Sequence, residues 1–203
     1  MTVTLHQGDI PASLSFGTHV AVDAEMMGLK PLRDRLCLVQ LSAGDGDAHV
    51  VQFRAGQYGA PNLKKLLSDP AVTKIFHFAR ADIATIWTYL NVVTAPIYCT
   101  KIASKLARTY TEYHGLKHLC KDLLNIELDK QQQASNWGAD TLSPEQIHYA
   151  ATDVFYLHRL RDALNITLER EGRMALAQPC FDFLPARALL DVAGWDAEDI
   201  FAH

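Results

Sequence analysis

Cysteine is scarce in this sequence, and its spacing argues against two common uses of the residue. The four cysteines lie far apart and form no Cys-x-x-Cys pair: Cys37, Cys99, Cys120 and Cys180. Paired spacing is expected of a zinc ribbon or a thioredoxin-like redox site. Three of the four stand within apolar stretches, where buried reduced thiols are the usual state. We therefore favour free, buried thiols over disulfides or a thiol nucleophile.

Basic residues are not in excess either. Lys and Arg together number 19 against 23 Asp and Glu, which gives a formal net charge of −4. Proteins that bind long nucleic acids through their phosphates usually carry a positive balance. Any contact with nucleic acid is therefore expected to be local, short and assisted by metal ions.

Long apolar runs, linkers and repeats are also absent. Every apolar stretch is interrupted by a charged residue within a few positions, so no segment is expected to span a bilayer. The first residues lack the basic and apolar regions of a signal peptide, which predicts a cytoplasmic protein without a membrane partner. With 203 residues, 49% of them hydrophobic and 21% charged, the chain is predicted to form a single domain over 1–203.

Apolar periodicity predicts a sheet followed by helices. Strands are expected at 19–24, 35–42, 48–53, 73–77 and 97–99, with a hairpin turn at 44–47. Helices are expected at 62–68, 80–90, 101–108, 115–124, 144–170 and 173–190. Asn62 and Ser143 are the expected helix caps, and Pro144 follows the second of them in the first turn. This order predicts an α/β fold with a mixed central sheet flanked by helices and a helical C-terminal part.

Two acidic residues alternate around the end of the strand at 19–24, in the sequence Val22-Asp-Ala-Glu-Met26. Side chains at positions i and i+2 of a strand project to the same face, so Asp23 and Glu25 face one way. Two ionised carboxylates side by side repel each other unless a cation neutralises them. The alternative is a strand end that runs into solvent, where both charges are simply hydrated.

Further acidic residues occur in two other elements. Asp82 falls in the first turns of the helix at 80–90, where the helix dipole alone would favour it. Tyr149 and Asp153 are four apart on a later helix and share a face, which an ordinary amphipathic helix would also explain. Each element is weak by itself, but together they supply four carboxylates and one phenol.

Four converging carboxylates are suited to hard divalent cations such as Mg²⁺ or Mn²⁺, which prefer oxygen ligands. Two such cations about 3.5–4 Å apart activate water and stabilise the leaving oxygen in phosphoryl transfer. A phenol beside one of them can orient the attacking water or accept its proton. The set Asp23, Glu25, Asp82, Tyr149 and Asp153 is therefore predicted to hydrolyse phosphodiesters with two divalent metal ions.

This set resembles the DEDD exonuclease superfamily, in its tyrosine-containing branch. The residues at 22–25 are similar to the first motif of that family, those at 77–82 to the second, and those at 149–153 to the third. The resemblance implies 3′→5′ exonuclease activity with 5′-mononucleotide products. It also implies that Asp23, Glu25 and Asp153 bind the catalytic metal, that Asp23 and Asp82 bind a second one, and that Tyr149 positions the nucleophilic water.

The resemblance extends beyond the motifs to about 19–165, and the stretch at 128–137 is similar to ribonuclease D. It implies a ribonuclease-H-like core, with 166–203 as a helical extension. The segment after Asp153 is too short for the additional C-terminal helical domains of ribonuclease D, so no HRDC domain is expected.

Within this family the sequence is most similar to the small form called nano-RNase C, in the stretches 5–10, 27–29, 33–37 and 40–42. That resemblance implies cleavage of diribonucleotides and very short RNA, and a homo-oligomer in the form of an octameric ring. Three alternatives stay open. They are 3′→5′ degradation of single-stranded DNA, ribonuclease D-type trimming of longer RNA such as tRNA 3′ ends, and an RNA-binding scaffold without activity.

Seven further residues are predicted to contact the substrate: Met26, Leu29, His77, Lys130, Gln133, Ser135 and Trp137. Leu29 is expected to wedge against a base, although it could equally pack in a loop. His77 is expected to bond a sugar or phosphate, with a satisfied core histidine as the alternative. The segment that ends at Trp137 is expected to form one edge of the substrate site. The alternative is a solvated loop anchored by a buried Trp.

Other polar residues carry weaker predictions. Arg80 and Arg108 are candidate phosphate contacts on grounds of charge alone. His114 and His118 stand four apart without a third zinc ligand at a suitable spacing. The apolar residues at 173–203 are expected to pack on the domain itself, with a subunit interface as the alternative.

Overall fold

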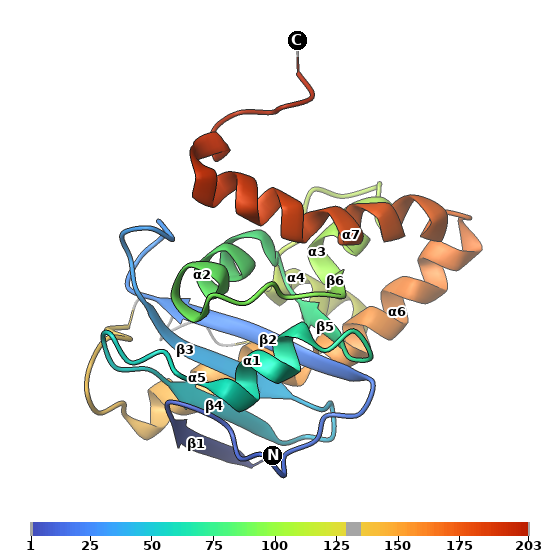
Figure 1. The fold of residues 1–203 in the computed structure, drawn as a ribbon. Coiled ribbons are helices and arrows are strands. Elements are labelled where there is room, and N and C mark those ends of the chain that lie inside the picture. The colour runs from blue at the N-terminus through green and yellow to red at the C-terminus, as the bar shows by residue number, and fades with distance from the viewer. Residues whose placement is uncertain (1, 129–134, 203) are drawn as a thin grey trace.

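The computed structural model describes residues 2–128 and 135–202 (Figure 1). Lys130 and Gln133 therefore lie outside the described residues. The strands are β1 (Val3–Gln7), β2 (His19–Met26), β3 (Leu36–Ser42), β4 (Ala48–Gln52), β5 (Thr73–Phe76) and β6 (Ile97–Cys99). The helices are α1 (Pro61–Ser68), α2 (Arg80–Leu90), α3 (Thr100–Ala107), α4 (Leu116–Leu124), α5 (Pro144–Phe155), α6 (Leu157–Arg170), α7 (Met174–Leu190) and the π-helical turn η1 (Asp191–Trp195).

All six strands join one mixed sheet in the order β1-β4-β3-β2-β5-β6. β3 pairs antiparallel with both β2 and β4, and β5 pairs parallel with both β2 and β6. The short connection between β3 and β4 confirms the hairpin predicted at 44–47. The mixed sheet and its five predicted strands are thus confirmed.

The first strand of the sheet was not predicted from the sequence. Val3–Gln7 forms β1, which pairs parallel with β4 from Val3 opposite Ala48 to Gln7 opposite Gln52. An edge strand buries little side-chain surface, and no residue of β1 is fully buried. Its pairing depends on backbone hydrogen bonds, which leave no apolar pattern in the sequence.

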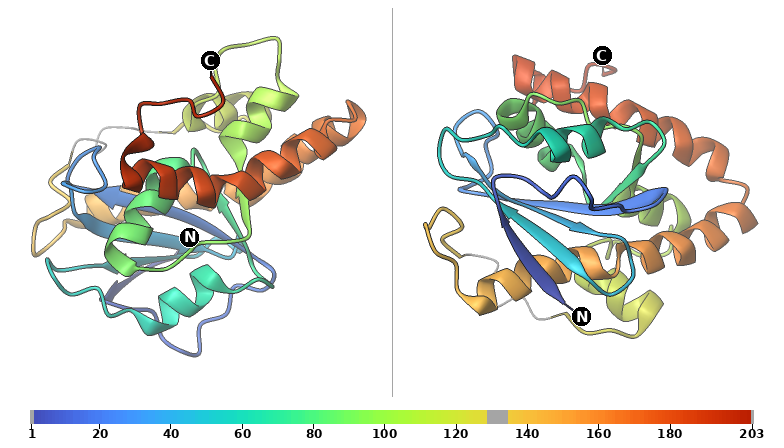
Figure 2. Two further views of the ribbon diagram at one scale, coloured as in Figure 1. Left: turned by 45° about the horizontal axis from the view of Figure 1, so that its top comes forward. Right: turned by 60° about the horizontal axis from the view of Figure 1, so that its bottom comes forward.

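Helices cover both faces of the sheet, with α2 and α7 on one side and α5 on the other (Figure 2). α5 lies across the first four strands of the sheet order and turns Ala150 and Ala151, both fully buried, toward them. These small side chains let the helix backbone approach the sheet closely. No helix among the described residues is both long enough and apolar enough to cross a membrane.

Two details of the predicted helices are corrected. The helix expected at 144–170 is divided into α5 and α6 at Tyr156. The chain there leaves the sheet and packs against α3 and α4, a change of direction that apolar periodicity does not record. Asn62 is not a cap either, because α1 begins one residue earlier and Asp9 accepts the backbone N–H groups of Asn62 and Leu63.

The parallel strands bring their C-terminal ends to one edge of the sheet. β2 pairs with β5 through Ala21 opposite Ile75, and β5 with β6 through Phe76 opposite Cys99. Residues just beyond those pairs, among them Asp23 on β2 and His77 after β5, therefore lie at the same edge. The acidic residues predicted from the sequence gather here.

Candidate active site

Three carboxylates converge at this edge of the sheet. Asp23 and Glu25 come from β2 and Asp153 from α5, and one oxygen of each lies within 4.8 Å of the others. The predicted clustering of these three residues is confirmed. They line a cleft of about 260 Å³ together with His77 and Tyr149.

β2 presents its two carboxylates on one face, as the alternation predicts. Ala24 between them is buried at 6% exposure. The register between β2 and β3 shifts between Glu25 and Met26, and a bulge at a strand end re-aims the side chains beside it. β2 thus delivers both carboxylates to the cleft beside α5 just before the pairing ends.

α5 supplies Asp153 and the phenol of Tyr149. Its start is fixed by a capping box: the Ser143 hydroxyl accepts the backbone N–H of Gln146, and the Gln146 side chain accepts the backbone N–H of Ser143. Tyr149 is 9% exposed, and its ring stacks on Trp137 with centroids 6.1 Å apart. The ring is therefore held in place before any substrate arrives.

Asp82 lies beside the three converging carboxylates. It occupies the first turn of α2, as predicted, and is 7% exposed. Its charge is close enough to raise the pKa of Asp23, and that of Asp153 raises the pKa of Asp82. Asp82 is thus part of the same electrostatic cluster.

Burial and mutual repulsion disfavour the ionised form of these acids. Burial is the larger cause and the neighbouring charges the smaller, and together they raise the pKa of Asp23 and Asp82 far above the ordinary value. The same causes raise the pKa of Glu25 to about 8, with Asp153 and Asp82 as the repelling charges. A divalent cation removes both penalties, since it neutralises the carboxylates without protons.

His77 is oriented by its neighbour on the next element. Its Nδ1 lies 2.9 Å from the Thr100 hydroxyl, which in turn donates to the Phe76 carbonyl 3.2 Å away. The Thr100 hydroxyl therefore ties the His77 ring to the end of β5.

The residues of this site fall within a match to a known family. The chain matches the family of 3′-5′ exonuclease domains over residues 9–169, which include all four acids and the tyrosine. The chain belongs to the DEDD family of 3′-5′ exonucleases.

Solved structures and curated relatives agree with this family. Brucella melitensis NrnC with bound Mg²⁺ is 51% identical to the exonuclease, with a TM-score of 0.96 over 100% of both chains. NrnC of that organism bound to pGG is 52% identical, with a TM-score of 0.97 over 100% of this chain and 99% of that one. Ribonuclease D of Acidiphilium cryptum is 37% identical over 76% of this chain but only 39% of its own length. The exonuclease thus spans about two fifths of that relative, and the predicted ribonuclease-H-like fold is confirmed by the structural matches.

The cluster fits the divalent metals that this family uses. The three clustered residues offer carboxylate oxygens, the ligands that Mg²⁺ prefers over nitrogen or sulfur. Asp23, Glu25 and Asp153 are near enough to one another to share a cation. A metal site of this chemistry has a consequence for the stability of the exonuclease.

In the presence of a chelator, we expect the protein to lose stability as the pH rises from about 4.5 to about 8. Those are the ordinary and folded-state pKa values of Glu25. Within this window Glu25 in the unfolded chain has released the proton that it still holds in the folded chain, so its contribution to the free energy of unfolding falls by up to about 1.4 kcal/mol per pH unit. Thermal unfolding at pH 5.5 and pH 8, with Mg²⁺ or with chelator, measures this.

Glu25→Gln provides the comparison, since its amide does not titrate. At pH 8 without metal the variant should unfold several degrees above the wild type, and at pH 5.5 this advantage should shrink. Saturating Mg²⁺ should remove the advantage at pH 8. Parallel pH dependence of the two proteins in chelator would show that Glu25 is not held in a repelling cluster.

The loop after β2 turns Leu29 outward. Asp34 accepts the backbone N–H of Lys30 and pairs with Arg33, and a Cβ at Gly28 would lie 2.4 Å from an Asp34 oxygen. Leu29 is 89% exposed as a result. This position suits the predicted wedge.

Met26 faces α2 more than the cleft. Its sulfur accepts a hydrogen bond from the Thr85 hydroxyl at 2.8 Å. The side chain therefore has a structural partner, and its predicted contact with substrate remains a prediction.

Trp137 does not offer the exposed face that the prediction of base stacking requires. The residue is 3% exposed and its ring covers Tyr149. The interpretation as a buried anchor is therefore the better one, and its effect on the site is to hold Tyr149. Ser135 is half-buried nearby, and its carbonyl accepts the backbone N–H of Trp137.

Several other polar residues serve the fold instead of the site. Arg108 is 3% exposed and donates to Asp122 and to the Tyr113 carbonyl, which leaves little of it for phosphate. His114 bonds the Ser104 hydroxyl. None of the four cysteines forms a disulfide, and three of them are buried, as predicted; Cys180 is exposed.

Three features of the cleft are not predictable from the sequence. Gly115 and Leu116, at the start of α4, line it beside the carboxylates. Thr100 orients His77 from α3. No motif marks them, because each is brought to the site by the packing of α3 and α4 behind the sheet edge.

Proposed function

We propose that this protein is a 3′→5′ exoribonuclease that hydrolyses diribonucleotides and very short RNA to 5′-mononucleotides with two divalent cations. The observation that carries the proposal is the convergence of Asp23, Glu25 and Asp153 beside the phenol of Tyr149. Asp82 completes the set of four acids that two cations require. Mg²⁺ and Mn²⁺ are the candidate metals.

Each side chain has a distinct role in this mechanism. Asp23, Glu25 and Asp153 would hold the first cation, and Asp23 with Asp82 the second. Bound cations of this kind lower the pKa of water and neutralise charge on phosphate oxygens. The Tyr149 hydroxyl orients the attacking water, since Trp137 fixes the ring that carries it. His77, which lines the same cleft, would bond a sugar or phosphate of the terminal nucleotide.

A short substrate fits the size and charge of the site. The cleft holds about 260 Å³, and the protein as a whole carries a net charge of −4. A negative protein attracts the phosphates of a long chain poorly, so binding depends on the cations and on the terminal residues. NrnC bound to pGG provides a parallel in a chain 52% identical to this one.

Competition between substrates tests the proposed length. A 5′-phosphorylated diribonucleotide and a 5′-phosphorylated 20-mer RNA, at equal concentration with Mg²⁺, should give turnover of the dimer at least about tenfold faster. Efficient stepwise trimming of the 20-mer with the dimer left over would instead indicate ribonuclease D-type processing. A matched deoxyribo-dimer in the same assay separates RNA from DNA specificity.

Phe78 is a further candidate for substrate contact that the sequence does not reveal. Its φ of 64° lies in the left-handed region, which costs a non-glycine residue roughly 1–2 kcal/mol. Its ring is nevertheless 52% exposed, lines an apolar pocket with Leu29, and lies 3.6 Å from the Lys101 ammonium. An exposed aromatic ring on a strained backbone, next to His77, is suited to stack on a base of the substrate.

Phe78→Gly should therefore separate function from stability. We expect KM for the diribonucleotide to rise about tenfold, because stacking on one base contributes about 1–3 kcal/mol. The unfolding midpoint should not fall, since glycine adopts this φ without strain. Asn91→Gly is the control, because Asn91 has a φ of 52° at the end of α2. Unchanged KM in Phe78→Gly would contradict the stacking role.

The predicted homo-oligomer, its octameric ring and the cytoplasmic location remain predictions. Native mass spectrometry of the purified chain measures the first two directly.

A further inference from the structure

The first turn of α2 is held by a segment more than a hundred residues away. Arg80 begins α2, and its guanidinium donates to both carboxylate oxygens of Asp191 at 2.6 and 2.7 Å. It also donates to the Asp196 carbonyl at 2.8 Å. The Asp191 side chain is only 10% exposed, so this ion pair is largely shielded from solvent on the carboxylate side.

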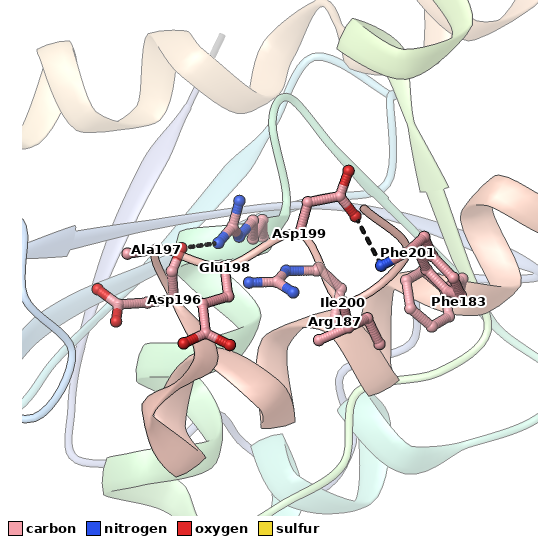
Figure 3. Close-up of a pocket in the computed structure, with 9 residues that line it drawn as sticks. Phe183, Arg187, Asp196, Ala197, Glu198, Asp199, Ile200 and Phe201 are labelled. Atoms are coloured by element: carbon pink, nitrogen blue, oxygen red, sulfur yellow. Dashed lines mark hydrogen bonds between the residues drawn. The ribbon is translucent and has the colours of Figure 1, made fainter. Parts of the chain in front are cut away.

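The partner segment is itself hydrogen-bonded to α7. We call residues 191–196 the C-terminal turn; it consists of η1 and Asp196. Arg187 on α7 donates to Asp191 at 2.6 Å and to the Trp195 carbonyl at 2.5 Å. Residues 196–201 fold back over Arg187 (Figure 3). The Phe201 ring packs on Phe183.

α2 needs such support because it has no cap of its own. Its N-cap position is Ala79, whose side chain makes no capping hydrogen bond, and the preceding Phe78 has a left-handed backbone. An uncapped helix start frays unless something else holds it. Asp82, two residues after Arg80, lies in the same turn.

The C-terminal turn also borders the loop that carries Leu29. Asp196 pairs with the Lys30 ammonium at 3.4 Å. Val192 and Gly194 form a wall of the apolar pocket of about 340 Å³ that Leu29 lines. The same short segment thus contacts two parts of the candidate site.

We propose that Asp191 is a positioning residue for the metal site, which acts through Arg80 to fix the first turn of α2 and so the carboxylate of Asp82. The inference rests on the proposed function of the acidic cluster. It explains why two arginines are joined to one buried carboxylate at this point of the fold. Loss of the Arg80–Asp191 pair should loosen Asp82 and weaken metal binding.

The response of the unfolding midpoint to Mg²⁺ tests this without a measurement of activity. In Asp191→Asn the Mg²⁺ concentration that gives half of the midpoint shift should rise at least about fivefold. With the diribonucleotide, kcat should fall about tenfold, the usual effect of a residue that supports metal ligands, while KM stays within about twofold. Glu198→Gln, the same change of a carboxylate to an amide on an exposed residue just after the C-terminal turn, should match the wild type.

Two arginine variants distinguish positioning from charge and from plain stability. Arg80→Gln removes a positive charge near the cations, so a purely electrostatic effect would tighten Mg²⁺ binding, whereas loss of positioning weakens it. Arg187→Gln removes a similar bond to Asp191 but lies on α7, so it should lower the unfolding midpoint and leave the Mg²⁺ response within about twofold. If Arg80 instead contacts phosphate, Arg80→Gln raises KM and Asp191→Asn does not.

Each outcome is decisive. Weaker Mg²⁺ responses in both Asp191→Asn and Arg80→Gln support the proposal. A wild-type Mg²⁺ response in either variant overturns it, as does a loss of activity that follows only the loss of folded protein. If Asp191→Asn does not fold, Arg80→Gln carries the test alone. A wild-type protein that shows no response to Mg²⁺ overturns the proposed metal site itself, and this inference with it.

Discussion

Asp23→Asn should abolish metal-dependent hydrolysis while the folded protein becomes no less stable. Asp23 is the one acid assigned to both cations, and it lies among three other carboxylates. Replacement of its charge should lower kcat on a diribonucleotide by at least ~10²–10³-fold. The neutral amide also ends the repulsion that raises the pKa of the native carboxyl, so the unfolding midpoint in chelator should rise.

The opposite signs of these two effects make the test specific. Asp182→Asn, the same change on an exposed face of α7, should alter neither quantity. Turnover near the wild-type value in Asp23→Asn would exclude the acidic cluster as the site of chemistry. A large fall in the midpoint would mean that Asp23 supports the fold and not the cations.

Tyr149→Phe should reduce kcat about 10²-fold and leave Mg²⁺ binding unchanged. The substitution removes only the hydroxyl that orients the attacking water, a contribution typical of acid–base groups. The ring keeps its stacking on Trp137, so KM and the unfolding midpoint should stay close to the wild-type values. Steady-state kinetics together with a Mg²⁺ titration of the midpoint measure both parts.

Tyr156→Phe is the matched control. Tyr156 lies seven residues after Tyr149, at the junction of α5 and α6. This variant should behave as the wild type. If Tyr149→Phe retains full kcat, the phenol takes no part in the reaction. If Tyr149→Phe lowers kcat only through weaker Mg²⁺ binding, the hydroxyl acts on the cations and not on the water.

The carboxylate cluster was predictable because its signals are local. Alternation on β2 sets the direction of Asp23 and Glu25, and the four-residue spacing on α5 sets that of Tyr149 and Asp153. Both patterns involve residues only two or four positions apart in the sequence. Their convergence followed from the order of strands and helices along the chain.

The surroundings of the cluster depend on long-range packing, which the sequence does not record. Arg80 pairs with a residue 111 positions away, a partner that no local pattern indicates, and its phosphate contact stays a prediction. Trp137 became a buried support for Tyr149, whereas its residue type indicated base stacking. Phe78 is exposed and has a left-handed backbone, which the usual preferences of phenylalanine do not predict.

Hydrolysis of pGG in ¹⁸O-labelled water, with Mg²⁺ or with chelator, tests the central claim most directly. Attack of a metal-activated water on the bridging phosphorus should yield two molecules of pG for each pGG. One of the two, from the 3′ nucleotide, should carry a single ¹⁸O in its phosphate, and chelator should stop the reaction. Unlabelled pG, a 3′-phosphate or cyclic phosphate product, or equal turnover in chelator would contradict a metal-dependent hydrolysis at this site.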